Sequence, residues 1–343
     1  MKLEQRTLRI CTMILICAVV MRLLSGGLLD TLAQALASPR VASILLYLET
    51  GRVIRPLPQQ SDVPEQTDPT QPTTPSQTLP PEAVLPVFSP EEADSIAVSN
   101  FSGYDADMEA LLQQPLSWDL TADGPAVLIV HSHGTESYVN NENYTESTDY
   151  RTLDVRYNMV SIGDHLAAIL EANGIAVLHD RTLHDYPSFN SSYDNSRASV
   201  QEYLTQYPSI RMVLDLHRDA AEDSKGNQLD RSVVINGQKV AQLMMVVGTD
   251  AGGLNHPNWQ NNMALAAKLH VLLNRSTPEL CRPISFRTQR FNQDLSAGAM
   301  LIEVGAAGNT RQEALLAAEL LAQGIIDLAH GSAPYAITAD STS

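Results

Sequence analysis

Basic residues are scarce in this chain of 343 residues: Lys and Arg number 22 against 39 Asp and Glu, which gives a formal net charge of −17. Sequence-independent nucleic-acid binding depends on neutralising phosphates with Lys and Arg, so this balance argues against that function. It also argues against broad adhesion to anionic lipid or to acidic wall polymers, while a local basic groove would still be compatible with it.

Cysteines and several signature motifs are missing as well. The three cysteines are Cys11, Cys17 and Cys281, of which two share one apolar run and the third lies far away, so no disulfide within a domain is expected. The chain has no Cys-x-x-Cys zinc or redox motif, no internal repeat, no Gly-rich phosphate loop and no Gly-x-Ser-x-Gly elbow. What it has is 44% hydrophobic residues, enough for a sizeable core in one or two domains.

The N-terminus carries a marginal membrane segment. An apolar run from Ile10 to Met21 follows Lys2, Arg6 and Arg9, and extends through Leu29 if Arg22 reaches back to the interface. We expect an uncleaved anchor over residues 1–30, with the rest of the chain outside the cytoplasm. A cleaved signal peptide and a buried helix are the alternatives.

A proline-rich tether is expected between the anchor and the folded domain. Residues 56–90 contain ten of the nineteen prolines, mixed with Gln, Thr, Ser and Asp, a composition that cannot bury a core. Before it, Val41 to Leu48 is typical of a short amphipathic helix. We therefore divide the chain into an anchor (1–30), a juxtamembrane helix with a Pro-rich linker (31–98) and a catalytic domain (99–335).

The domain alternates predicted strands and helices. Short apolar runs predict buried strands, helical spacing and capping signals predict helices, and Asn236-Gly237 predicts a hairpin turn. The alternation indicates an α/β domain with a mixed, mostly parallel sheet flanked by helices. The expected strands are 127–130, 175–178, 212–216, 233–235, 240–247 and 300–304, and the expected helices are 159–170, 199–203, 264–273 and 310–329.

Polar residues that a core does not need follow three of these strands, where ligands bind in open α/β sheets. His133 and Glu136 lie in the first cluster, His217 and Arg218 in the second, and Glu303 in the third. Two imidazoles and a carboxylate are a common ligand set for a catalytic Zn²⁺, which leaves a fourth position for water. We therefore expect His133, Glu136 and His217 to bind zinc and Glu303 to act as general base.

Each of these residues also has an ordinary structural interpretation. A His-x-x-Glu pair occurs often by chance, and a histidine such as His217 is more often capped or on the surface. Glu303 could pair permanently with Arg218, which we include with Glu303 as a candidate catalytic residue. His131 could replace His133 as a metal ligand or support the ligands from behind.

Several segments of the domain, taken in order, resemble those of a known family. The chain resembles the stage II sporulation protein P family of membrane-anchored cell-wall hydrolases in endospore-forming bacteria. The matching segments run in order from about residue 125 to 320: His131-Ser-His133-Gly-Thr-Glu136-Ser-Tyr138, His179-Asp180 through Tyr186-Pro187, Asp215-Leu-His217-Arg218-Asp219-Ala220, Val247-Gly-Thr249, His256-Pro-Asn-Trp259 with Asn261, Asn292-Gln-Asp294-Leu-Ser296, and Glu303-Val-Gly305 with Asn309-Thr310.

The resemblance implies a zinc-amidase-like fold and a zinc-dependent N-acetylmuramoyl-L-alanine amidase. Such an enzyme would thin septal peptidoglycan during engulfment, with stage II sporulation proteins D and M as partners. The family is also credited with endopeptidase action on cross-links. In the amidase relatives the glutamate ligand lies near the following helix, where this chain has none, and Glu136 takes its place in our assignment.

Two other functions fit the same residues. A zinc carboxypeptidase or endopeptidase on wall peptides would use the same ligands and base. A non-catalytic wall-binding scaffold would use the polar residues only to hold loops, and would purify without stoichiometric zinc.

Overall fold

The computed structural model describes residues 86–116, 119–120, 123–139 and 149–330. The expected anchor and most of the expected linker lie outside these residues. Within the described ranges, none of the helices is both long and apolar enough to serve as a membrane span.

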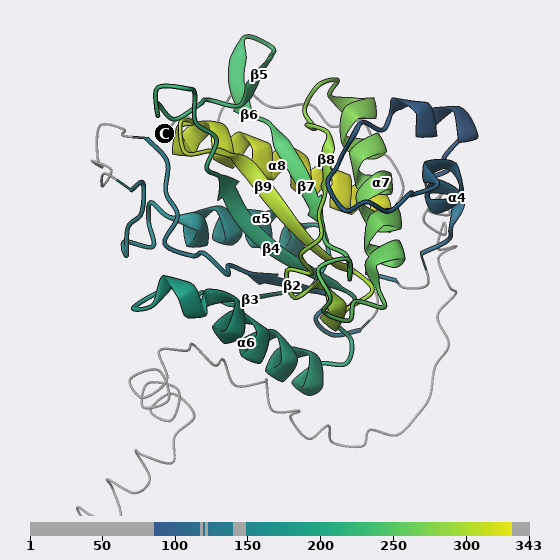
Figure 1. The fold of residues 1–343 in the computed structure, drawn as a ribbon, viewed down its shortest axis with the longest axis horizontal. Helices are drawn as coiled ribbons and strands as arrows, with labels where there is room; N and C mark the ends of the chain where they lie inside the picture. The colour runs from purple at the N-terminus through teal and green to yellow at the C-terminus, as the bar shows by residue number, and fades with distance from the viewer. Residues whose placement is uncertain (1–85, 117–118, 121–122, 140–148, 331–343) are drawn as a thin grey trace, which may run out of the picture. The chain divides into compact units, whose positions relative to one another are not determined.

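In the described residues, seven strands form one mixed sheet in the order β1-β8-β7-β9-β4-β2-β3 (Figure 1). The sheet consists of two groups of parallel strands: β9, β4, β2 and β3 form one group, and β7, β8 and β1 form the other. The groups meet where β7 pairs with β9, and these two strands are antiparallel. This confirms the predicted mixed, mostly parallel sheet. The strands are β1 Val98–Asn100, β2 Val127–Val130, β3 Val177–His179, β4 Met212–Asp219, β7 Leu243–Val247, β8 Ile284–Phe286 and β9 Ala299–Ala306.

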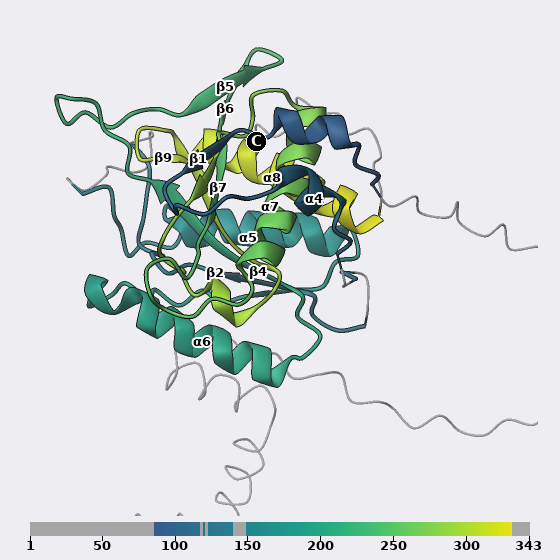
Figure 2. The same ribbon diagram turned by 45° about the vertical axis from the view of Figure 1, so that its right-hand side comes forward.

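Helices cover both faces of the sheet. One face packs against α6, and the other packs against α5, α7 and α8 (Figures 1 and 2). The bounds are α4 Met108–Gln113, α5 Met159–Ala172, α6 Ser192–Gln206, α7 Trp259–Ser276 and α8 Arg311–His330, together with the short 3₁₀ helices η1 Pro90–Ser95, η2 Phe189–Ser191 and η3 Gln293–Leu295.

The alternation of side chains along β4 decides which residues reach the site. Met212, Leu214 and Leu216 belong to the large core shared with α5, α7 and α8. Val213 belongs to the smaller core under α6. Because successive side chains of a strand point to opposite faces, Asp215 and His217 lie on the α6 face.

Most predicted elements are present, and several have different limits. The strand at 127–130 is confirmed as predicted, whereas β4 and β9 extend the predicted strands to eight residues each. The predicted capping box of α8 is present, with the Glu313 amide donating to the Thr310 hydroxyl and the Thr310 amide donating to Glu313. The expected short helix at 199–203 is the middle of the 15-residue α6.

The predicted long strand at 240–247 is wrong. The chain breaks it at Gln242 into β6 (Gln238–Ala241), which pairs with β5 (Ser232–Ile235) in a separate hairpin, and β7, which enters the main sheet. The Gln242 backbone marks the switch between the two ladders. Its amide donates to the Arg231 carbonyl beside the β5–β6 pairing, and its carbonyl accepts from the Gly305 amide beside the β7–β9 pairing. The hairpin projects from the sheet (Figure 1).

Candidate active site

The ends of β2, β4 and β9 meet because these three strands are neighbours in the sheet. Val130 of β2 pairs with Asp215 of β4, and His217 of β4 pairs with Glu303 of β9. Paired residues of adjacent strands send their side chains to the same face, so His217 and Glu303 both face the α6 side. The predicted convergence of polar residues is therefore present for β4 and β9.

His133 lies against His217 in an aromatic enclosure. The two imidazole centroids are 5.2 Å apart with nearly perpendicular planes. The Phe189 ring stacks parallel to the His133 ring at 4.4 Å, and Tyr193 meets its edge at 5.5 Å. The Nδ1 atom of His133 is buried and has no hydrogen-bond partner among the described residues. Burial lowers the pKa of His133, so the ring is held neutral, the form that binds metals.

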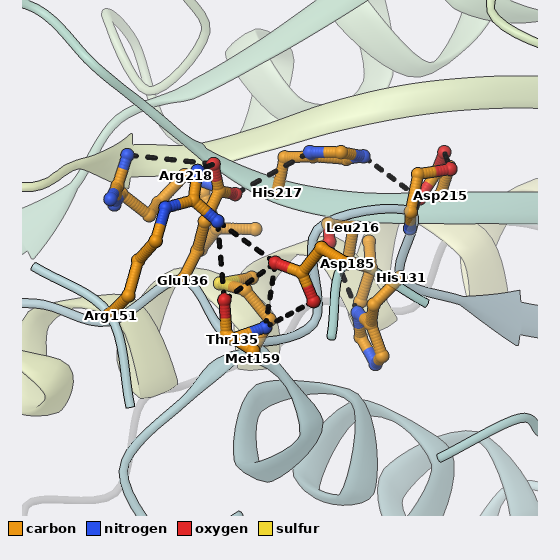
Figure 3. Close-up of polar contacts among 12 residues, drawn as sticks. His131, Thr135, Glu136, Arg151, Met159, Asp185, Asp215, Leu216, His217 and Arg218 are labelled. Carbon is orange, nitrogen blue, oxygen red and sulfur yellow. Dashed lines mark hydrogen bonds and ion pairs between the residues drawn. The ribbon is translucent and has the colours of Figure 1, made fainter. Parts of the chain in front are cut away.

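His217 lies between two carboxylates (Figure 3). Its Nε2 is 2.9 Å from Oδ1 of Asp215, although the two are not aligned for a hydrogen bond, and its Nδ1 is 3.4 Å from Oε2 of Glu136. Burial alone would lower the pKa of His217, but the charges of Asp215 and Glu136 raise it well above its usual value. The site therefore attracts positive charge to the His217 position.

Glu136 is surrounded by positively charged and hydrogen-bonding groups. Its Oε2 accepts from the Arg218 amide at 3.2 Å, and its Oε1 lies 3.4 Å from Arg151 and 3.5 Å from the Arg218 guanidinium. Burial opposes its ionisation, but His217 and Arg218 lower the pKa of Glu136 to about 2. Glu136 is thus a fixed anion beside His217.

Arg218 does not serve as the partner of Glu303 that its position in the sequence suggested. Its buried guanidinium donates to the carbonyls of Ser137 and Tyr150 at 3.1 Å and 3.0 Å and lies near Glu136. The Oε2 of Glu303 is buried and has no hydrogen-bond partner within the described residues. Burial raises the pKa of Glu303 to about 8, with Glu136 and Asp219 acting in the same direction.

His131 is separated from the other candidates by the alternation of the strand. Its Nδ1 lies 3.0 Å from the Leu216 carbonyl and its Nε2 lies 2.8 Å from Nε2 of His179, which contacts Asp164 in turn. Gly163 of α5 permits this contact, because a Cβ there would lie 2.7 Å from Nε2 of His131. The structure therefore brings His133, Glu136 and His217 together and directs His131 toward α5.

The donor set fits a zinc ion in its chemistry. As they stand, no three His, Cys, Asp or Glu side chains in the described ranges are grouped tightly enough to hold a metal ion. However, buried polar atoms normally have partners, and Nδ1 of His133 and Oε2 of Glu303 have none among the described residues. Two imidazoles, one ionised carboxylate and a second carboxyl group are the components of a catalytic zinc site.

Three contributors to the site were not assigned from the sequence: Asp215, Phe189 and Tyr193. Asp215 had a usable signal, because it lies two residues before His217 on a strand and so must share its face. Phe189 and Tyr193 had none, because their approach to His133 depends on how α6 and η2 pack beneath the sheet.

Comparison with known families decides the kinship of the chain. The family described as "Stage II sporulation protein P (SpoIIP)" matches residues 57–326. The chain belongs to this family. It is 28% identical over 215 residues to stage II sporulation protein P of Bacillus subtilis (strain 168), a match that covers 59% of this chain and about half of that relative (50%).

Solved structures of amidases resemble part of this SpoIIP-family chain, at low sequence identity and low structural similarity. The N-acetylmuramoyl-L-alanine amidase AmiC2 of Nostoc punctiforme is 13% identical, with a TM-score of 0.38 over 60% of this chain and 98% of its own. Ami1 from Mycobacterium smegmatis, an N-acetylmuramyl-L-alanine amidase, is 11% identical, with a TM-score of 0.39 over 61% of this chain and 98% of its own. Likeness at this level assigns neither ligand nor activity.

Proposed function

We propose that this SpoIIP-family protein is an extracytoplasmic peptidoglycan hydrolase, a zinc-dependent N-acetylmuramoyl-L-alanine amidase that acts on septal wall during sporulation. Family membership supports the wall substrate and the sporulation role. The observation that carries the chemistry is the cluster of His133, His217 and Glu136 beside a carboxyl group, Glu303, whose buried Oε2 has no partner in the described structure.

In this proposal His133, Glu136 and His217 hold the zinc ion. When bound, zinc supplies Lewis acidity and lowers the pKa of a coordinated water. Arg218 keeps Glu136 ionised and in place through the contacts described above. Phe189 stacks on the His133 ring and Tyr193 contacts it at nearly a right angle, so the two rings would limit its rotation.

Glu303 is the proposed general base and acid. The positive charge of a bound zinc ion would favour the ionised form of Glu303. Its Oε2 would then take a proton from the attacking water and deliver it to the nitrogen of the amide bond that breaks between the muramic acid lactyl group and L-alanine, so that the carboxylate returns to its starting state. The contacts of Arg218 with Glu136 and two carbonyls support this role, because they leave Glu303 without the permanent ion pair that a structural carboxylate would need.

The sequence and the family resemblance support a proposal for the cellular setting. An anchor at residues 1–30 and a Pro-rich linker would tether the enzyme to the cell membrane, with the catalytic domain outside the cytoplasm at the sporulation septum. Stage II sporulation proteins D and M are the expected partners in engulfment.

Digestion of purified sacculi by the full-length protein in detergent tests the function. We expect mass analysis to find free stem peptides that begin with L-alanine, together with stoichiometric zinc in the protein, and neither product nor turnover in a Glu303→Gln control. Cleavage only between peptides would instead identify a carboxypeptidase or endopeptidase. Zinc-free protein that binds sacculi and releases nothing would identify a scaffold.

A further inference from the structure

Asp215 is held in one orientation by its neighbours. Its Oδ1 accepts from the Ser132 amide at 2.7 Å, and its Oδ2 accepts from the Ser132 hydroxyl at 2.6 Å. The Ser132 hydroxyl in turn contacts the Ser196 hydroxyl of α6 at 2.7 Å. A buried carboxylate with donors on both oxygens cannot turn freely, so Asp215 presents a fixed negative acceptor to the ring of His217.

The two nitrogens of His217 have different surroundings. Nε2 lies 2.9 Å from Asp215, which is the usual length of a hydrogen bond, whereas Nδ1 lies 3.4 Å from Glu136, which is longer than usual. Zinc binds imidazole nitrogen and carboxylate oxygen at about 2.0–2.2 Å, and in a tetrahedral site two such ligand atoms are about 3.4 Å apart. The Nδ1 separation from Glu136 therefore has the length expected for two ligands of one zinc ion.

We propose that Asp215 is a positioning residue that fixes His217 so that Nδ1 binds the metal beside Glu136 while Nε2–H donates to Asp215. This inference rests on the proposed zinc enzyme. It requires the ring to rotate enough to bring Nε2–H into line with Oδ1 of Asp215. A carboxylate behind a ligating histidine fixes the tautomer and ring orientation and makes the ligand more basic.

Nuclear magnetic resonance of ¹⁵N-histidine-labelled, zinc-loaded protein tests the assignment directly. We expect the His217 ring, identified by its loss in His217→Gln, to keep a proton on Nε2 and to carry none on Nδ1. A proton on Nδ1 with the metal on Nε2 would overturn the proposal whatever the activity of the protein.

Zinc affinity of Asp215→Asn gives the second measurement. The substitution preserves the shape of the side chain and removes its charge, so zinc binding should weaken by about 10–100-fold. Asp180→Asn is the matched control, because Asp180 is also a buried carboxylate beside a histidine and a serine: His184 Nε2 lies 3.0 Å from its Oδ2, and the Ser199 hydroxyl donates to the same atom. The control should keep its zinc affinity.

Three outcomes separate this inference from the proposed function. Weakened zinc binding in Asp215→Asn but not in Asp180→Asn supports it. Equal affinity in Asp215→Asn and the wild type, with an active zinc enzyme, overturns the positioning role and leaves the enzyme intact. A wild-type protein that binds no zinc overturns both. Because Asp215→Asn could fail to fold, Ser132→Ala provides a milder variant, for which a smaller loss of zinc affinity is expected.

Discussion

At the scale of single residues, Glu303 and Arg218 differ in their surroundings although they lie on the neighbouring strands β9 and β4. The Arg218 guanidinium donates hydrogen bonds to two carbonyls and forms an ion pair with Glu136, whereas the buried Oε2 of Glu303 has no partner in the described structure. An unpartnered buried carboxyl group costs stability, so it persists where another requirement maintains it. Proton transfer at a cleavage site is such a requirement.

Replacing Glu303 with Gln should leave a folded, zinc-loaded and nearly inactive protein. The substitution keeps the shape and removes the basic atom, so kcat should fall by on the order of 10²–10⁴. Thermal unfolding should change little, because no ion pair of Glu303 with Arg218 is lost. Amide hydrolysis, zinc content and the unfolding curve are measured together, and near-normal turnover would exclude Glu303 as the base.

Substitution of the proposed ligands should separate His131 from His133. His133→Ala and His217→Ala should each lose most of the bound zinc, because two remaining protein ligands hold the ion weakly. His131→Ala should retain most of it, since its nitrogens face Leu216 and His179. Zinc content of the purified variants is the measurement, and zinc kept by His133→Ala but lost by His131→Ala would exchange their roles.

At the scale of elements, the sequence predicted the strands that carry chemistry better than the short strands β1 and β8 on one side of the sheet. The apolar runs of β2, β4 and β9 are long enough to be recognised, and their polar ends meet on one edge as expected. β1 and β8 have three residues each and could not be recognised from their own pattern. Contacts between layers, such as the stacking of Phe189 on His133, arise only from packing, so no local sequence pattern predicts them.

Helix α7 carries a buried lysine that should make stability depend on alkaline pH. Lys268 donates to the Leu112 carbonyl and lies 4.8 Å from the Phe88 ring centroid, and burial lowers its pKa to about 8. The unfolded chain has a lysine pKa of about 10.4 and so binds more protons between these values, which means that stability should rise with pH from about 8 to about 10.

Comparison with Lys268→Met isolates this contribution, because other groups titrate equally in both proteins. The rise in the free energy of unfolding from pH 8 to pH 10 should be larger in the wild type than in the variant. Denaturant unfolding at both pH values measures it. Equal slopes in the two proteins would mean that Lys268 stays charged in the folded state.

At the scale of the whole molecule, the family match extends from residue 57, through the expected tether, into the sheet domain. The structure nevertheless describes the chain only from residue 86 onward, and there the N-terminal segment already contacts the domain, since Arg275 of α7 pairs with Glu92 at 2.7 Å. The boundary between tether and domain should therefore lie before residue 90, earlier than the predicted start at residue 99.

Shortening the tether offers a test of that division. Deleting residues 59–78 removes prolines and polar residues whose composition cannot bury a core, so the domain should keep its thermal unfolding temperature and its zinc content. Full-length protein and deletion variant should both stay with membranes after a high-salt wash, because the deletion leaves the proposed anchor at residues 1–30 unchanged. In cells, the shortened protein should release less wall material than the full-length protein, because a Pro-rich segment spans about 3 Å per residue and its loss draws the domain toward the membrane.

A matched variant that replaces the same segment with a Gly/Ser sequence of equal length should restore most of the release of wall material. A lower unfolding temperature in the deletion variant would show that residues 59–78 pack against the domain, and recovery of a soluble protein that begins near Ser38 would show that the anchor is cleaved.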